Sequence, residues 1–269
     1  MSNYKSKLGN LWTYRELLKQ LTIRNVELRH RGSHLGIFWS IISPLILLVL
    51  YVVVFGYIFQ GKFGARADES RLDYALALFV GLTLFHFVAE IIATAPTLIL
   101  SNPNFVKKVV FPLDILPVAT VGSAALHAGI TLSLALIGVA VWGTGISQTW
   151  LWLPLILLPV LLLALGLAWL LSALGVFFRD LAQMSQFMTM VLMFSSAIFY
   201  PTSSIPPAIW SGLKFNPLIH AVELARDIIV WHVAPSSFSL IYLNTCAFAA
   251  VGVGFFVFRG LRDAFADVV

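Results

Sequence analysis

The sequence predicts an all-α integral membrane protein, on the basis of its composition, its long apolar segments and the placement of its basic residues. Of its 269 residues, 59% are hydrophobic and 11% are charged, whereas soluble domains are about half apolar and about a quarter charged. A chain of this composition is expected to fold within a lipid bilayer. We expect residues 1–269 to form a single transmembrane domain.

Six segments are long and apolar enough to cross a membrane as helices. A hydrocarbon core about 30 Å thick requires about 20 apolar residues in a helix. The fourth and fifth segments are separated only by Arg179 and Asp180, which predicts a tight turn. An even number of spans places both ends of the chain on one side. The predicted spans are 35–59, 74–100, 115–142, 150–178, 181–200 and 238–258.

Basic residues are concentrated on one side of these six spans. The N-terminal segment, the second-to-third connection, the fourth-to-fifth turn and the C-terminus together hold twelve of the seventeen Lys and Arg residues. Cytoplasmic loops carry an excess of Lys and Arg, so the pattern predicts that both termini are cytoplasmic. Orientation also explains the net charge of +5, and we expect no nucleic-acid partner.

The N-terminal segment 1–31 is predicted to contain an amphipathic helix on the cytoplasmic membrane surface. Between residues 9 and 30, apolar side chains share one helical stripe while charged residues point elsewhere. Such a helix binds at the membrane interface, and it can act either as an anchor or as a docking surface for a partner. The members of the stripe are Leu11, Tyr14, Leu18, Leu21 and Leu28.

The cytoplasmic connection 101–112 is predicted to form one short helix that protrudes from the membrane. Ser101 can cap its start, Pro103 is tolerated in its first turn, and Pro112 ends it. Several apolar side chains in an exposed loop indicate either a partner or burial at the lipid interface. These side chains are Phe105, Val106, Val109, Val110 and Phe111.

Two apolar pieces of the external connection 201–237 are too short to cross the membrane. The first lies around Ile205–Trp210 and the second covers Asn216–Trp231. Pieces of this length are typical of re-entrant or interfacial helices. We expect them to form a lid over an external opening.

The sequence lacks the common phosphate-binding, nucleophile-elbow and zinc-protease motifs, so no enzyme activity is expected of this chain. His86 and Glu90 are four residues apart, and His220 and Glu223 are three apart. Each pair can share a helix face, but two ligands do not make a metal site, and none is predicted. Glu90 lies within a span, where an ionisable group usually faces a polar partner or a water-filled cavity. Both a structural hydrogen bond and a proton relay are compatible with its position.

Several short motifs, in their order and spacing, resemble the ABC-2 type permease subunits that export polysaccharides, including lipopolysaccharide O-antigen, capsule and teichoic acid. The resemblance extends over nearly the whole chain. One departure is His34, where the family often has tyrosine. The motifs are Arg31-Gly-Ser-His-Leu-Gly36, Phe38-Trp39 and Pro44, Asn102 through Pro112, Leu116-Pro117, Arg179-Asp180, Tyr200-Pro201, Ile205-Pro206, Asn216-Pro217 and Arg226-Asp227.

The resemblance implies a homodimer of this permease with two copies of a separate ATPase subunit. That subunit would bind ATP and Mg, so no cofactor is expected in this chain. Residues 101–112 would be the coupling helix seated in a cleft of the ATPase, with the N-terminal helix beside it. The residues implied for coupling are Asn102, Phe105, Lys107, Lys108, Phe111 and Pro112. Those implied for the interfacial helix are Arg24, Glu27, Arg29 and Arg31.

A channel between the two permease copies, lined by analogy from spans one and five, would pass a lipid-linked polysaccharide outward across a bacterial inner membrane. The segment 201–231 would be its external gate. Aromatic faces can stack on sugar rings. The side chains predicted to line the channel or gate are Trp39, Phe55, Phe59, Phe194, Phe199, Tyr200 and Trp210. Those given structural or polar roles in the membrane are Glu90, Arg179, Asp180, Arg226 and Asp227.

Two other function classes remain open from the sequence. A stand-alone channel or proton-coupled carrier would use Glu90 and His86, and would work without an ATPase. A membrane-embedded enzyme such as a glycosyltransferase would need an acidic or metal-binding site in a loop. The acidic residues available for it, Asp68, Glu69 and Asp73, are expected to form only a solvated charge cluster.

Overall fold

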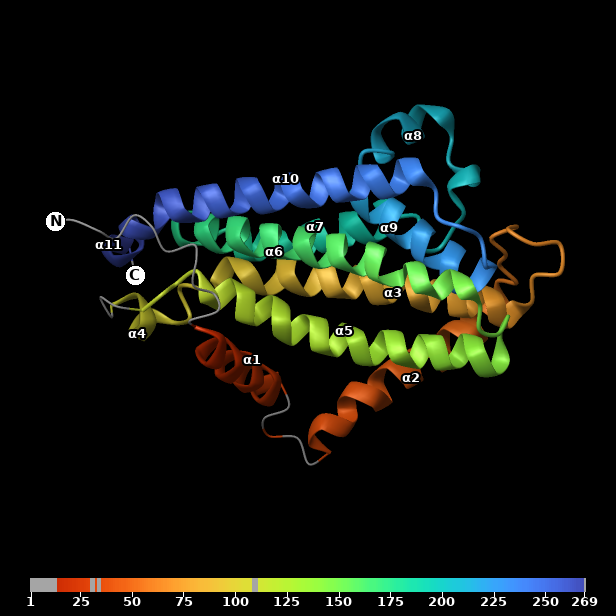
Figure 1. Ribbon diagram of the computed structural model, residues 1–269, viewed down its shortest axis with the longest axis horizontal. Helices are drawn as coiled ribbons and strands as arrows, with labels where there is room; N and C mark the ends of the chain where they lie inside the picture. The colour runs from red at the N-terminus through yellow and green to blue at the C-terminus, as the bar shows by residue number, and fades with distance from the viewer. Residues whose placement is uncertain (1–13, 30–31, 33–34, 108–110, 269) are drawn as a thin grey trace.

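The computed structural model describes residues 14–29, 32, 35–107 and 111–268, and within these residues every regular element is helical. The long helices run side by side along one axis (Figure 1). This arrangement follows from the composition, because a backbone in hydrocarbon must satisfy its own hydrogen bonds, as a helix does.

Five of the described helices are long and apolar enough to cross a membrane, and they coincide with predicted spans one, two, three, four and six. The first is α2 (Trp39–Tyr51) with its π-helical continuation η3 (Val52–Ile58). The others are α3 (Arg71–Thr94), α5 (Ile115–Trp142), α6 (Leu153–Phe177) and α10 (Ser237–Leu261).

The predicted fifth span, 181–200, is shorter in the structure. Its helix, α7 (Leu181–Ser195), has fifteen residues and is therefore about 22 Å long. The side-chain amide of Asn216 donates to the carbonyl of Ser195 at 3.1 Å and to the hydroxyl of Ser196 at 3.0 Å. Ala197 then adopts a left-handed φ of 50°. A distant residue thus ends the helix, and hydropathy alone does not reveal it.

Helix α3 occupies the centre of the bundle. Eighteen of its 24 residues are buried, whereas only two of the thirteen in α2 are. α3 contacts α2, α5, α6, α7 and α9. The more exposed helices α2 and α7 therefore pack on α3 from outside.

Helices α6 and α10 pack with their backbones in close approach at two glycines. A Cβ atom on Gly254 would lie 2.1 Å from the carbonyl oxygen of Gly166, and a Cβ on Gly166 would lie 2.4 Å from that of Ala250. Small residues of this kind allow close helix contact in membranes.

The connection 201–237, predicted to be external, forms two helices at the predicted positions. α8 (Pro207–Leu213) has no buried residue and lies outside the bundle (Figure 1). α9 (Pro217–Arg226), continued by the π-helical η7 (Asp227–Trp231), is largely buried and contacts α3, α6 and α10. The second apolar piece is thus a short, buried helix at the predicted position, while its re-entrant character and the lid role remain predictions.

The remaining helices, α1 (Arg15–Arg29), α4 (Pro103–Val106) and α11 (Phe265–Val268), lie toward the other end of the bundle (Figure 1). An apolar cluster joins them to α5, α6 and α10. α1 packs directly on α5, where a Cβ on Gly122 would lie 3.2 Å from the hydroxyl of Thr22.

The predicted apolar stripe of α1 is only partly correct. Leu21 is buried, and Tyr14 and Leu18 pack against the same cluster. Leu28, in contrast, is 46% exposed, and Leu11 lies outside the described residues. The helix uses its apolar face to dock on α5, which its spacing alone did not indicate; its contact with lipid remains a prediction.

Candidate functional site

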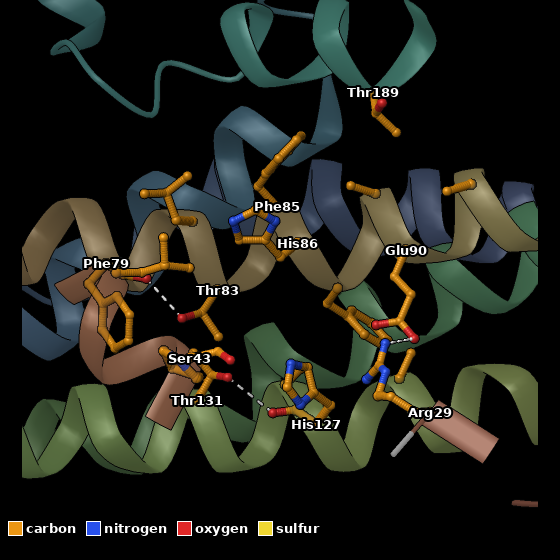
Figure 2. Close-up of a pocket in the computed structure, with 18 of the residues that line it drawn as sticks. Arg29, Ser43, Phe79, Thr83, Phe85, His86, Glu90, His127, Thr131 and Thr189 are labelled. Carbon is orange, nitrogen blue, oxygen red and sulfur yellow. Dashed lines mark hydrogen bonds and ion pairs between the residues drawn. The ribbon is translucent and has the colours of Figure 1, made fainter. Parts of the chain in front are cut away.

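A cavity of about 530 Å³ lies between α2, α3 and α5, and it is bounded by Arg29 of α1 and Thr189 of α7 (Figure 2). Its volume falls within the range of small-molecule sites, roughly 300–1,000 Å³. Apolar side chains dominate the lining. The polar side chains in it are Arg29, Ser43, Thr83, His86, Glu90, His127, Thr131 and Thr189.

An ion pair between Arg29 and Glu90 lies at one end of this cavity (Figure 2). The two side chains are 31% and 20% exposed. The pair confirms that Glu90 has a polar partner, as expected for a carboxylate within a span. It also joins the last residue of α1 to the central helix α3.

Two histidines extend the polar lining from opposite helices. His86 lies one turn before Glu90 on α3, and His127 comes from α5 (Figure 2). Thr131 donates its hydroxyl to the carbonyl of His127 at 3.2 Å, and Thr83 donates to that of Phe79 at 2.8 Å. Each threonine oxygen keeps acceptor capacity. In the part of the chain that is described, no group of three or more His, Cys, Asp or Glu residues is arranged to hold a metal.

Aromatic rings continue from the cavity along α2 and η3. Tyr51 lines the cavity and lies 6.0 Å from Phe55, measured between ring centroids. Phe55 stacks on Phe59 at 5.7 Å and on Phe199 at 5.4 Å, and Phe194 lies 6.4 Å from Phe199. The structure therefore brings four of the seven predicted channel residues into one cluster, which we call the aromatic row.

Of the other three predicted channel residues, two lie on other parts of the helices and one is linked to the row through the backbone. Trp39 is 41% exposed at the start of α2, and Trp210 belongs to the outlying α8. Tyr200 donates its hydroxyl to the carbonyl of Phe194. The prediction omitted Tyr51, although its four-residue spacing from Phe55 and Phe59 was a signal that they share a helix face.

Arg226 is buried, and its guanidinium joins three segments. It donates to the carbonyls of Ala77 on α3 and Ala197 after α7, each at 2.9 Å, and to that of Ile198. Its charge lies 4.2 Å from the ring centroid of Phe63. A Cβ on Gly81 would lie 2.6 Å from the guanidinium, so glycine leaves the room that Arg226 occupies. The prediction of a structural role is consistent with these contacts.

The other polar residues singled out have local backbone or side-chain partners. Arg179 and Asp180 are exposed in the turn between α6 and α7. Asp227 begins η7, and its carbonyl accepts from the amide of Val233 at 2.8 Å. His220 contacts the carbonyl of Lys214 at 2.9 Å through Nε2. Glu223 accepts a hydrogen bond from Thr202, so neither member of that His–Glu pair faces the cavity.

The solvated charge cluster expected in the connection between α2 and α3 is wrong for two of its three members. Glu69 is 5% exposed and accepts from the amides of Phe63 and Gly64, both at 2.8 Å. Asp73 forms a capping box with Ser70 at the start of α3. Glu69 thus holds the loop and Asp73 caps a helix. Counting charges in the sequence does not distinguish carboxylates with such roles from carboxylates that only face water.

The predicted coupling segment is less helical than expected. α4 has only four residues, and its N-cap is Asn102 without a side-chain cap bond. Ser101 instead donates to the carbonyl of Leu98 at 3.2 Å, so the predicted serine cap is wrong. Lys107 is exposed and Pro112 is half-buried, while Lys108 and, at the end of the N-terminal segment, Arg31 lie outside the described residues.

The helix α1 does pack beside α4, as expected. Phe105 stacks on Phe111 with ring centroids 4.3 Å apart, and the guanidinium of Arg24 lies 5.9 Å from the Phe105 ring. Val106 is buried in the same apolar cluster. Part of the apolar character of this segment is therefore used within the chain. Glu27 is exposed on α1.

Comparison with known proteins gives a consistent result over nearly the whole chain. The family described as ABC-2 type transporter matches residues 16–230. The O-antigen export system permease protein RfbA of Klebsiella pneumoniae is 25% identical over 267 residues, 98% of each chain. A protein of the same name from Myxococcus xanthus is 26% identical over 96% of this chain and 97% of its own.

The Polysialic acid transport protein KpsM of Escherichia coli is 25% identical over 92% of this chain and 94% of its own. The family match covers more than half of the chain, and the described helices include five that are able to cross a membrane. This multi-pass membrane protein therefore belongs to the ABC-2 type transporter family.

Proposed function

We propose that this chain is the transmembrane subunit of an ATP-driven exporter that moves a lipid-linked polysaccharide from the cytoplasm across a bacterial inner membrane. The observation that carries the proposal is the near full-length similarity to export proteins named for O-antigen and polysialic acid. The chain itself acts as a permease and not as an enzyme.

The cavity and the aromatic row together form the candidate polymer path. They follow α2 from Arg29 at one end to Phe59 at the other. Rings with open faces bind sugars by stacking, which does not fix the position of a polymer along the path. A path of this kind suits a polymer that moves through it better than one deep, polar pocket would.

A homodimer would complete this path. α2 and α7 expose large apolar side chains, among them Val49 at 63% and Phe187 at 74%. Between them the cavity contains Arg29 and Glu90, which are costly to leave facing hydrocarbon. A second copy of the chain would cover these polar groups and line the path from both sides, with α7 as a sixth crossing.

The end of the bundle formed by α1, α4 and α11 is the proposed docking site for two ATPase subunits, which would bind ATP and Mg. The excess of Lys and Arg at this end supports a cytoplasmic location for both termini. α8 and α9, at the other end, would then lie on the external side. In this arrangement the segment 201–231 is placed to act as the external gate.

The proposal is tested by purifying the tagged full chain from its native membrane in mild detergent. We expect a co-purifying protein with a phosphate-binding glycine-rich loop, ATPase activity, and ATP-dependent glycan export after reconstitution. Transport of solute in vesicles by the chain alone, driven by pH or voltage without ATP, would instead support the carrier that uses Glu90 and His86.

A further inference from the structure

A second pocket adjoins the cavity described above, and the chemistry of the two is different. This pocket, of about 170 Å³, lies between α3, α5 and α6. Apart from Thr83 its lining is apolar, with Leu132, Leu157 and Val160 among its residues. An apolar space on the order of 150 Å³ in a protein core stays dry and takes up a small hydrophobic molecule.

The two spaces share three lining residues, Thr83, Phe87 and Ala128. A ligand that occupies both would have a charged or polar part near Arg29, Glu90 and the two histidines, and a hydrocarbon part beside α6. Such a ligand is an amphiphile. Because the two spaces adjoin at these shared residues, together they specify the kind of molecule that fits better than either space does alone.

The depths of the two parts match a lipid in the cytoplasmic leaflet. On α3, Thr83 precedes Glu90 by two turns, which is about 10 Å along the helix. With α1 at the cytoplasmic end, Arg29 lies nearest the cytoplasm and the apolar pocket lies deeper in the bilayer. A lipid that enters from this leaflet has its head and tail in the same order.

We infer that the cavity and the adjoining pocket form one binding site for a lipid with a phosphate head group. The phosphate binds Arg29, and the first part of the tail occupies the pocket between α3, α5 and α6. The inference deepens the proposed function and rests on it for the choice of cargo, since the carrier lipid of a glycan and a bilayer phospholipid share this chemistry.

The Arg29–Glu90 ion pair has a defined role in this site. A guanidinium forms similar paired hydrogen bonds with carboxylate and with phosphate, so Glu90 occupies Arg29 when no lipid is bound and competes with the phosphate. His86, one turn away on the same face of α3, is placed to pair with Glu90 once Arg29 has been taken. The empty site thus keeps both charges satisfied.

This role predicts opposite effects for the two members of the pair. Arg29→Gln removes the guanidinium that binds the phosphate. The variant should bind a long-chain polyprenyl phosphate about tenfold or more weakly, the scale of a charged hydrogen bond. Glu90→Gln removes the competitor and should strengthen binding. A purely structural ion pair would give losses of similar size in both variants, which would overturn the inference.

The apolar pocket has its own test at Gly129. A Cβ at this lining residue meets nothing within 4 Å, so Gly129→Leu should fill the pocket without displacing the backbone. It should weaken binding of polyprenyl phosphate and of uncharged polyprenol alike. Gly252→Leu on α10, where a Cβ also meets nothing within 4 Å, and Lys19→Gln, exposed on α1, are matched controls that should leave binding unchanged.

Binding to the purified full chain in detergent is measured by native mass spectrometry over a titration with polyprenyl phosphate, polyprenol or phosphatidylglycerol. Preference for polyprenyl phosphate with the variant pattern above supports a cargo site. Equal binding of phosphatidylglycerol with the same pattern supports the site and assigns its ligand to the bilayer. Polyprenol binding as tight as polyprenyl phosphate would overturn the inference. Because the assay needs neither ATP nor a partner, its failure is distinguishable from a failure of export.

Discussion

The guanidinium of Arg226 joins α3, the break after α7 and α9 through hydrogen bonds to backbone carbonyls. None of the ion pairs between described residues includes it. A buried cation is costly unless its hydrogen bonds are satisfied, and here the carbonyls and the face of Phe63 supply that compensation. Arg226 therefore helps to hold α9 against α3 and against the break after α7.

Replacing this residue tests that dependence. Arg226→Met keeps much of the volume but leaves three buried carbonyls without this donor, at roughly 1–3 kcal/mol for each unsatisfied group. We expect a clear fall in the midpoint of thermal unfolding in detergent, followed by tryptophan fluorescence. Arg179→Met, in the exposed turn before α7, is the control and should have little effect. Equal midpoints for the two variants would contradict the role given to Arg226.

At the residue scale, the sequence predicted the types of group better than their partners. It identified Glu90 as a carboxylate that needs a partner, and the partner is Arg29, which is 61 residues away in the chain. It also assigned four aromatic residues to one channel lining, and the structure brings these four together in the aromatic row. His127 was missed because, unlike His86, it has no carboxylate three or four residues away in the chain. Its place in the cavity lining opposite His86 depends on how α5 packs against α3.

At the scale of elements, the pair α6 and α10 is held by backbone contact at Gly166 and Gly254. Gly254→Ala would place a Cβ atom inside the carbonyl of Gly166, so the helices must separate. We expect a destabilisation of about 1–3 kcal/mol, as for other overpacked sites, measured as a lower thermal midpoint.

The matched control lies on the same helix, two residues away. A Cβ at Gly252 meets nothing within 4 Å, and alanine favours a helix over glycine by about 1 kcal/mol. Gly252→Ala should therefore leave the midpoint unchanged or raise it slightly. Equal thermal midpoints for Gly254→Ala and Gly252→Ala would contradict a close backbone contact between α6 and α10.

The short helix α4 is expected to transmit motion from the ATPase through its ring contacts. Phe105→Ala removes the stack on Phe111 and the contact with Arg24, with a loss of roughly 0.5–1.5 kcal/mol for the aromatic pair. We expect a complex that still assembles and hydrolyses ATP but exports glycan several-fold more slowly per ATP. Asn104→Ala, at an exposed position of α4, should retain full export; unchanged export in Phe105→Ala would contradict a coupling role.

The helices that cross the bilayer were predictable because a run of about 20 apolar residues is a local property of the chain. The end of α7 was not, since Asn216 from the next segment ends it. The length of α4 was overestimated for a related reason: Val106 packs into the cluster formed by α1, α5 and α10, and a pattern of caps and prolines does not include that packing.

At the scale of the whole molecule, burial is uneven across the chain. α3 is almost fully enclosed, while α7 has one buried residue, Ser185. A cavity with charged lining lies between the enclosed α3 and the more exposed α2 and α5. In the proposed homodimer a second copy would cover this surface. The sequence of a single chain does not indicate that the interface would lie on α2 and α7 in particular.

The proposed homodimer predicts a particle of two chains, each of 29.7 kDa, in detergent by light scattering coupled to size exclusion. Phe187→Lys on α7 should shift the protein to a single chain. Phe256→Lys on α10 is the matched control, because Phe187 and Phe256 are 74% and 79% exposed, each on an apolar helix. A single chain for the wild type, or equal disruption by both variants, would contradict an interface at α7.

The π-helical segment Val52–Ile58 gives the wall of the path an unusual mechanical property. Its bonds reach one residue further than in an α-helix, as in the bond from the amide of Phe59 to the carbonyl of Val54. A π segment therefore stores one surplus residue. Releasing that residue into the neighbouring turns would swivel Phe59 relative to Tyr51 by about 100°, the rotation of one α-helical residue. On the proposed polymer path, the rings would then release a sugar by a local change of helix pitch, without a movement of the whole bundle.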